Sequence, residues 1–245
     1  MISVCIASYN GEKFIESQVA SILKQLGAAD EVVVSDAGST DGTLRVLHRL
    51  NDTRLKVVEF HDPHPPVGGS VFAKMIRICR NFEHALRHAQ GDVIFLADQD
   101  DVWMDDKVEK VTAALERYVC VVHDCEVFDG EHVLQPSFLQ FRKPSPGLLG
   151  TFWKSPFMGC CMAFRRTVLE RALPIPDLPV EHDTYLGMIA CLVGEVGILR
   201  EPLIRYRRHG ANASSCSEGS DNPWRVMFLR RWYLLKALVG WKKRH

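Results

Sequence analysis

Three carboxylates stand within four residues at Asp98, Asp100 and Asp101, directly after the apolar run 93–97. Carboxylates crowded into one loop repel one another unless a cation neutralises them. A hard divalent cation binds oxygen ligands of this kind, and its remaining positions accept diphosphate oxygens. The alternative is a solvated acidic turn that caps the following helix. Because the cluster follows a buried strand, we favour a metal site.

Two further polar clusters also follow apolar runs: Ser8, Tyr9 and Asn10 follow residues 2–7, and residues 36–42 follow residues 31–35. Both clusters suit a nucleotide. Asp36 can accept a hydrogen bond from a base NH, and the small residues Gly38 and Ser39 allow the backbone to approach closely. Residues 36–42 are equally typical of a tight turn followed by a helix cap. Composition alone leaves both interpretations open.

Two other segments carry side chains suited to proton transfer or to phosphate binding. Asp183 opens a predicted helix after the Pro-rich stretch 174–179. A carboxylate there either caps the helix or takes a proton from an attacking hydroxyl, and composition alone favours the cap. The run that ends in Arg207, Arg208 and His209 either grips phosphates or forms a solvated strand end.

Strands and helices alternate in the first half of the chain. The patterns predict strands over 2–7, 31–35, 56–60 and 92–97, and helices over 15–26, 43–50, 81–89 and 104–115. Strand–helix–strand units build parallel, doubly wound sheets. In such sheets ligands bind beyond the carboxyl ends of the strands, which is where the three polar clusters fall.

The second half of the chain is less regular. We predict a long loop over 61–74, one or two strands over 119–134, an irregular stretch over 135–150, a strand over 158–164, a helix over 182–193 and one or two strands over 195–206. A mobile loop rich in Ser and Gly over 211–222 then precedes a final helix over 224–241.

The bulk composition describes one large α/β domain. The 245 residues carry a net charge of zero, which excludes a broad basic field for nucleic acid. The eight cysteines show no readable disulfide pattern. We interpret Cys5, Cys79 and Cys191 as core thiols, and Cys120, His123 and Cys125 as buried strand residues in preference to a zinc clip. With no signal peptide and no run of transmembrane length, the cytoplasm is the expected compartment.

The final helix has an apolar stripe. Phe228, Trp232, Leu235 and Val239 recur at helical spacing, and further Trp residues lie near its ends, as interfacial aromatics do. Residues 224–245 contain seven Lys/Arg and no Asp/Glu, which favours the anionic inner face of a cytoplasmic membrane. These charges are not segregated on one side, so packing on protein remains an equal alternative.

Six segments in this order resemble the family-two inverting glycosyltransferases of the GT-A fold: residues 4–18, 35–43, 91–103, 159–166, 182–183 and 206–214. They look most like the rhamnosyltransferase-like members that build bacterial surface polysaccharides. The resemblance implies a Rossmann-like, mostly parallel sheet flanked by helices. Residues 1–125 would form the nucleotide-sugar-binding half, 126–210 the acceptor and catalytic-base half, and 211–245 a flexible loop plus a basic amphipathic helix.

The resemblance also implies roles for single residues. Asp36 would contact the donor base, and Ala37 replaces the second acid of the family's Asp-Asp-Gly-Ser loop. Asp98 and Asp100 match the Asp-x-Asp motif, and Asp183 matches the catalytic base, preceded here by His182 in place of the commoner Glu. The substrate-binding set is then Ser8, Tyr9, Asn10, Asp36, Gly38, Ser39, Asp98, Arg207 and Arg208, and the metal set, for Mg²⁺ or Mn²⁺, is Asp100 and His209.

The implied reaction is an in-line displacement with inversion at the anomeric carbon. The expected donor is a nucleotide-diphosphate sugar, dTDP-rhamnose first and a UDP-hexose second, and the acceptor is a hydroxyl of a glycan or lipid-linked glycan. One rival is a catalytically inactive nucleotide-sugar or glycan-binding module, which retention of Asp98, Asp100 and Asp183 disfavours. Another is a sugar nucleotidyltransferase, but residues 8–13 hold one Gly and no Gly-rich phosphate loop. The Gly-x-Gly-x-x-Gly of a dehydrogenase is absent from that position.

Overall fold

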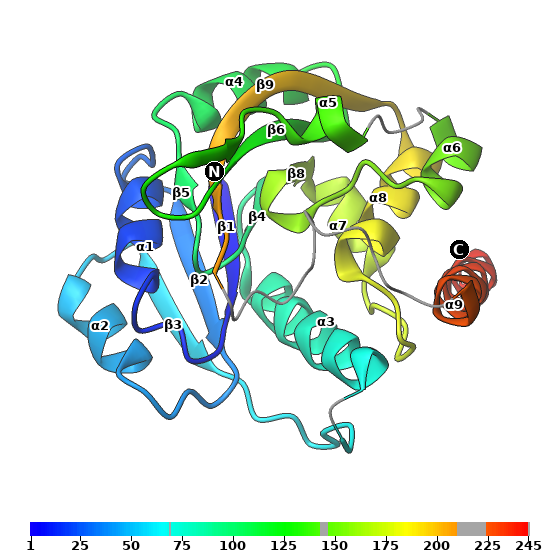
Figure 1. Ribbon diagram of the computed structural model, residues 1–245, viewed down its shortest axis with the longest axis horizontal. Helices are drawn as coiled ribbons and strands as arrows, with labels where there is room; N and C mark the ends of the chain where they lie inside the picture. Colours follow the sequence, from blue (N-terminus) through cyan, green and yellow to red (C-terminus); the bar gives the residue numbers. More distant parts are fainter. Residues whose placement is uncertain (69, 143–146, 210–223, 245) are drawn as a thin grey trace.

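The computed structural model describes residues 1–68, 70–142, 147–209 and 224–244, and these form one mixed α/β fold (Figure 1). Four strands are parallel in the order β3-β2-β1-β4: β1 (Ile2–Ser8), β2 (Glu31–Asp36), β3 (Leu55–Glu59) and β4 (Val93–Ala97). The mostly parallel sheet flanked by helices that the sequence predicted is therefore confirmed.

The sheet continues beyond β4 with mixed polarity. β8 (Met162–Arg165) runs antiparallel to both β4 and β6 (Cys120–Phe128), and β9 (Val196–Arg207) runs parallel to β6. The short strands β5 (Val102–Trp103) and β7 (Val133–Gln135) pair antiparallel with β9 and β6. Residue 126 lies inside β6, so this strand belongs to both predicted halves of the domain, and that division stays a prediction.

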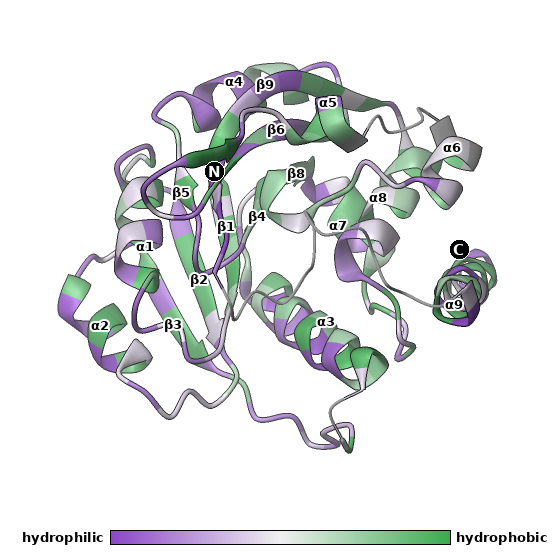
Figure 2. Cartoon of the chain, viewed as in Figure 1, coloured by the Kyte–Doolittle hydropathy of each residue, from purple (hydrophilic) through white to green (hydrophobic). Residues whose placement is uncertain are grey.

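Helices cover both faces of the parallel strands. α1 (Ile15–Leu23) and α2 (Thr43–Leu50) lie on one face, and α3 (Val71–His88) crosses the other and packs on β1 and β2 (Figure 1). α4 (Lys107–Leu115) packs on β6 and β9. Apolar residues run along the central strands and on one side of α3 (Figure 2), where Val32, Val33 and Val34 are fully buried.

The remaining helices follow the sheet's mixed part. They are α5 (Phe138–Arg142), α6 (Gly147–Trp153), the 3₁₀ turn η1 (Gly159–Cys161), α7 (Arg166–Ala172), α8 (His182–Val193) and the predicted C-terminal helix α9 (Trp224–Lys242). Among the helices that the structure describes, none combines the length and the apolarity that crossing a bilayer requires. The predicted loop over 211–222 lies outside the described residues.

Several boundaries predicted from the sequence were wrong. α3 begins at Val71, well before the predicted start at residue 81, because Ser70 caps it by accepting a hydrogen bond from the backbone N of Ala73 (3.2 Å). The predicted irregular stretch 135–150 contains α5 and the start of α6, and α7 was not predicted at all. The helix expected from Met104 begins at Lys107. The one or two strands predicted over 195–206 are confirmed as a single strand, β9, shifted by one residue.

The cysteine predictions hold with one exception. Cys5 and Cys79 are buried, and Cys120, His123 and Cys125 are buried within β6 as predicted. Cys191, near the end of α8, packs against the core but is only partly buried, so the prediction of a core thiol holds there only in part.

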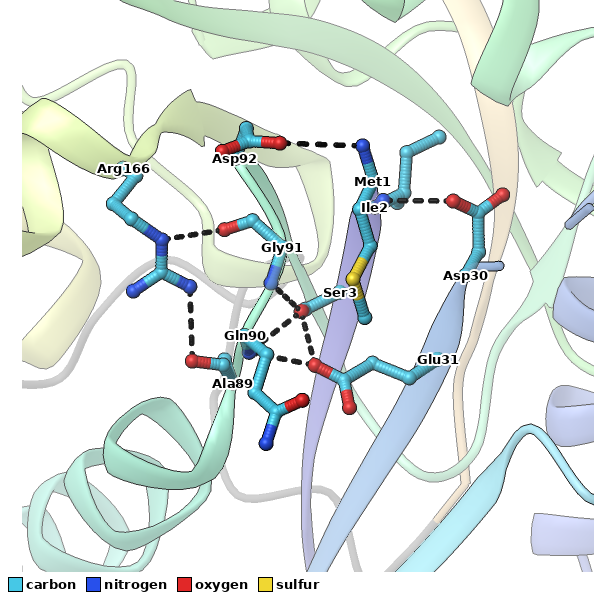
Figure 3. Close-up of polar contacts among 10 residues, drawn as sticks. All are labelled: Met1, Ile2, Ser3, Asp30, Glu31, Ala89, Gln90, Gly91, Asp92 and Arg166. Atoms are coloured by element: carbon cyan, nitrogen blue, oxygen red, sulfur yellow. Dashed lines mark hydrogen bonds and ion pairs between the residues drawn. The ribbon is translucent and has the colours of Figure 1, made fainter.

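A polar network holds the amino ends of the strands together (Figure 3). Ser3 Oγ donates to Glu31 Oε1 (2.6 Å), and the backbone N of Gly91 donates to Ser3 Oγ (2.7 Å). The guanidinium of Arg166 donates to the carbonyl oxygens of Gly91 (2.7 Å) and Ala89 (2.9 Å). Arg166 therefore fixes the entry to β4 at the sheet edge opposite the polar clusters, which is a structural role.

Candidate active site

The carboxyl ends of β1 and β2 meet at one edge of the sheet, because neighbouring parallel strands end together. Ser8 Oγ donates to Asp36 Oδ2 (2.7 Å), and the backbone N of Asn10 donates to Ser39 Oγ (2.8 Å). Asn10 has a left-handed backbone with φ of 50°, which turns the chain sharply after β1. The first two polar clusters therefore form one connected surface, as the sequence predicted.

The third cluster joins the first through Tyr9 and Gln99. The backbone N of Tyr9 donates to Gln99 Oε1 (2.9 Å), and Gln99 Nε2 donates to the Tyr9 carbonyl (3.1 Å). A Cβ on Gly11 would lie 2.5 Å from Gln99 Oε1, so this contact needs glycine. The Tyr9 side chain is 56% exposed and so remains available to a ligand.

Asp36 is fully buried and turns its carboxylate into its own loop. Its Oδ1 accepts from the backbone N of Ser39 (2.7 Å), and its Oδ2 accepts from the hydroxyls of Ser39 (2.6 Å) and Ser8. Gly38 completes the turn with φ of 78° and open space around its Cα. This geometry fits the tight-turn interpretation, and the contact of Asp36 with a base stays a prediction.

The acidic loop after β4 crowds carboxylates and a thiol together. One ligand atom from each of Asp98, Asp101 and Cys160 lies within 4.8 Å of the others. Burial, followed by the charges of Asp100 and Asp183, raises the pKa of Asp98 to about 7. Burial and the neighbouring carboxylates raise the pKa of Asp101 well above its ordinary range. Within the described part of the chain, the buried Oδ2 of Asp101 has no hydrogen-bond partner.

The end of β9 closes over this acidic loop. His209 Nε2 lies 2.7 Å from Asp100 Oδ2, and the His209 ring stacks on Phe14 at 4.7 Å between centroids. The backbone N of Arg207 donates to Asp101 Oδ1 (3.0 Å), and Arg207 Nε donates to the Asp100 carbonyl (2.9 Å). The structure thus brings together Asp100 and His209, the two residues predicted to bind metal.

The two predicted phosphate-binding arginines are partly engaged by protein groups. The guanidinium of Arg207 also lies over the rings of Phe128 (4.5 Å) and Phe14 (5.1 Å). The backbone N of Arg208 donates to the Phe128 carbonyl (2.7 Å), and the residue is partly buried. Arg207 therefore braces the acidic loop, and a phosphate contact for either arginine stays a prediction.

Asp183 lies in the first turn of α8 and faces the acidic loop. Its Oδ1 accepts from the backbone N of Thr184 (2.5 Å), and its Oδ2 accepts from the backbone N of Gly159 (3.1 Å). Gly159 begins the η1 turn, whose next residue, Cys160, reaches Asp98. The charge of Asp183 is also close enough to raise the pKa of Asp98. Asp183 thus accepts from a backbone N–H in the first turn of its own helix and lies beside the predicted donor site at the same time.

His182, just before Asp183, is an uncharged ring in this fold. It stacks on Phe82 with ring centroids 4.0 Å apart, and burial lowers its pKa to about 4. A Cβ on Gly159 would lie 2.9 Å from His182 Nε2, so glycine allows η1 to approach α8. The departure from the family's commoner Glu therefore removes a negative charge next to Asp183.

Sequence reasoning missed Lys107, which is fully buried beside the acidic loop. Its Nζ donates to the Cys160 carbonyl (2.9 Å) and lies 3.9 Å from the centre of the Trp103 ring. Burial lowers the pKa of Lys107 to about 8, while the charge of Lys107 lowers that of Asp98. A signal was present, because Lys107 precedes Val111 and Leu115 at helical spacing and so falls on the buried stripe of α4.

A polar stripe on α1 was also missed. Gln18, Ser21 and the following Gln25 recur at helical spacing and bond to backbone atoms between residues 98 and 108 (2.8–3.1 Å). Gln18 is fully buried, and its Nε2 donates to the Asp98 carbonyl. These side chains fix the acidic loop against α1. A buried glutamine among apolar neighbours cannot be distinguished from an exposed one by pattern alone.

Comparison with known structures identifies the fold class of the chain. The chain superposes on S. aureus TarS residues 1–349, determined in complex with UDP-GlcNAc, with a TM-score of 0.68 and 23% identity, covering 96% of this chain and 67% of that one. This likeness defines the fold as that of the GT-A glycosyltransferases, as the sequence resemblance implied.

The family follows from the sequence comparisons. A model described as "Glycosyltransferase like family 2" matches residues 1–190. The putative teichuronic acid biosynthesis glycosyltransferase TuaG of Bacillus subtilis is 34% identical over 97% of this chain and 88% of its own. The Escherichia coli UDP-Glc:alpha-D-GlcNAc-diphosphoundecaprenol beta-1,3-glucosyltransferase WfgD is 26% identical over 100% of this chain and 95% of its own. The chain belongs to glycosyltransferase family 2.

Proposed function

We propose that this glycosyltransferase moves a sugar from a nucleotide-diphosphate donor to an acceptor hydroxyl with inversion at the anomeric carbon. One observation carries the proposal: Asp183 is held by η1 next to the acidic loop that follows β4. The Asp183 carboxylate therefore lies beside the edge of the sheet where ligands of parallel α/β folds bind, which supports a role as general base. A direct displacement assisted by a base needs no covalent intermediate.

Asp183 acts as the general base in this proposal. The acceptor oxygen forms a bond to the anomeric carbon while the bond from that carbon to the diphosphate oxygen breaks, and the acceptor proton passes to Asp183. Two backbone N–H groups, from Thr184 and Gly159, hold its carboxylate in one orientation. A fixed carboxylate is an effective proton acceptor because no rotamer has to be selected during the reaction.

Asp100 and His209 are proposed to hold a divalent cation, Mg²⁺ or Mn²⁺. The fit rests on the crowding of carboxylates in the loop and on the 2.7 Å between His209 Nε2 and Asp100 Oδ2, which brings two ligand atoms together. Asp98, Asp101 and Cys160 form a second group of ligand atoms, but a thiol is a soft ligand that hard cations disfavour. Bound at Asp100, such a cation would neutralise the leaving diphosphate.

The donor is proposed to lie across Ser8, Tyr9, Asn10, Gly38 and Ser39, with its diphosphate toward Asp98, Arg207 and Arg208. Asp36 stabilises this surface through buried hydrogen bonds to Ser8 and Ser39, and it contacts the base only if its loop rearranges. The donor is dTDP-rhamnose or a UDP-hexose. The name of WfgD describes UDP-Glc as donor and a diphosphoundecaprenol-linked sugar as acceptor, which supports a lipid-linked glycan acceptor in this chain.

A panel of nucleotide sugars tests the proposal. The full chain is incubated with each donor and Mg²⁺ or Mn²⁺, and release of the nucleoside diphosphate is measured with and without EDTA. Metal-dependent release from one donor supports the transferase. A module without catalytic activity would bind a donor and release nothing, and a nucleotidyltransferase would instead consume nucleoside triphosphate and sugar phosphate.

A further inference from the structure

The C-terminal helix α9 packs on the domain through one face. Leu234 and Ala237 are 3% and 1% exposed. Arg230 Nη1 lies 3.0 Å from Glu181 Oε1 at the start of α8, and Arg231 Nη2 donates to the Trp153 carbonyl (2.8 Å) at the end of α6. The packing interpretation of this helix is therefore correct for its inner face, and α9 is part of the folded domain.

α9 lies at the periphery of the molecule (Figure 1), and its opposite face is apolar and exposed. Its residues recur at spacings of three and four, so they form one stripe along the helix. They are Trp224 (86% exposed), Phe228 (71%), Trp232 (41%), Leu235 (51%) and Val239 (50%). Trp153, whose carbonyl accepts from Arg231, is 72% exposed and lies beside the helix. We call these six residues the outer stripe.

The structure shows which basic residues of α9 contact the rest of the protein. Arg230, Arg231 and Arg244 donate to protein groups, the last to the Pro174 carbonyl at 3.1 Å. Arg244 is nevertheless exposed, as are the other four basic residues of the segment: Arg225, Lys236, Lys242 and Lys243. At 100° per residue Arg225, Lys236 and Lys243 project along one edge of the outer stripe, and Lys242 projects in the same direction as Trp224, about five turns further along the helix. All four point away from the inner face. Lys236 Nζ lies 3.6 Å from the centre of the Trp232 ring.

We propose that the outer stripe seats the protein on an anionic lipid bilayer, with α9 lying in the plane of the surface. An apolar stripe with aromatic residues and flanking basic groups is the pattern of an interfacial helix. The segment 224–245 contains no acidic residue. A second copy packed on this stripe would therefore bring like charges together, whereas an anionic surface complements them.

Vesicle sedimentation of the full chain tests this inference independently of the transfer reaction. The protein is mixed with phosphatidylcholine vesicles with and without phosphatidylglycerol. We expect binding to the anionic vesicles alone, and a loss of affinity of about fivefold for each of Arg225→Gln and Lys236→Gln.

Two double variants separate the stripe from general surface hydrophobicity. Phe228→Ser/Leu235→Ser should weaken vesicle binding by more than about tenfold. The control is Leu134→Ser/Phe141→Ser, which removes the same residue types at similar exposure (56% and 67%) on β7 and α5 and should bind normally. Thermal melting confirms that each variant is folded, since all four side chains are exposed.

Three results would overturn the inference. The first is that the wild-type protein does not bind anionic vesicles. The second is that both double variants bind these vesicles as the wild type does. The third is that the protein does not bind vesicles and that sedimentation velocity detects a dimer, which Phe228→Ser/Leu235→Ser dissociates. That last result would assign the outer stripe to a second copy of the chain.

Discussion

Replacing the proposed base by its amide, Asp183→Asn, separates its chemistry from its structural role. The amide has nearly the same shape but cannot take a proton from an acceptor hydroxyl. Its oxygen can still accept from the backbone N of Thr184, as Oδ1 does now at 2.5 Å. Its NH₂ group would face the backbone N of Gly159, where Oδ2 now accepts at 3.1 Å, so one hydrogen bond is lost.

The two consequences differ greatly in size. Losing one hydrogen bond costs about 1 kcal/mol of folding free energy, against a total of roughly 5–15 kcal/mol for a domain. The variant therefore stays folded. Losing the general base should lower kcat by about 10²–10⁴. A rate loss of that size cannot come from partial unfolding, and KM for the donor should change little because the base contacts the acceptor.

Glu181 provides the matched control for this variant. It is the nearest other carboxylate in sequence, but Arg230 pairs with it at 3.0 Å. Glu181→Gln should therefore lower kcat by less than about tenfold. Steady-state release of nucleoside diphosphate, with acceptor present, measures both variants. The reasoning is refuted if Asp183→Asn retains the wild-type rate, or if Glu181→Gln loses as much activity as Asp183→Asn.

Three further predictions follow from the same geometry. Asp100→Ala, like excess EDTA, should abolish sugar transfer. The melting temperature of the variant should stay within a few degrees of the wild type, because the substitution removes a charge from a crowded acidic loop. Full activity of the variant, or of the wild type in EDTA, would disprove the metal role. Burial lowers the pKa of His182 to about 4 from an ordinary 6.5, so the unfolded chain takes up a proton that the folded chain resists. Stability should therefore fall as the pH drops from about 6.5 to about 4, by at most about 3 kcal/mol, and urea titrations of His182→Gln should show a smaller fall than wild type over that range. Arg230→Gln should reduce the free energy of unfolding by about 1 kcal/mol in urea, since water can solvate the partly exposed Glu181 carboxylate in place of the guanidinium, and an unchanged midpoint would show that the ion pair contributes nothing.

The sequence predicted the sheet and the grouping of the polar clusters because both depend on local patterns. Apolar runs mark β1, β2 and β4, and parallel pairing then requires Ser8, Asp36 and Asp98 to lie at or beyond the same sheet edge. The strands of the second half were harder to order. β8 reverses direction between β4 and β6, and no local pattern specifies which distant strand pairs with it.

The details of the site depend on tertiary contacts that periodicity does not contain. Helical spacing indicates that Lys107 faces inward, but its hydrogen bond to the Cys160 carbonyl depends on η1 lying close to α4 in the folded chain. The inward orientation of Asp36 is set by Ser8 on the neighbouring strand. The two faces of α9 became distinct only through its partners, Glu181 among them, because the sequence alone places basic residues on every side of the helix.

The configuration of the transferred sugar tests the central claim most directly. Once the donor panel identifies a substrate, the product formed by the full chain is examined by NMR, and the one-bond coupling constants between C1 and H1 of the transferred sugar in donor and product are compared. A direct displacement assisted by Asp183 predicts that the new glycosidic bond has the opposite anomeric configuration to the donor. A product that retains the donor's configuration would contradict the proposed mechanism.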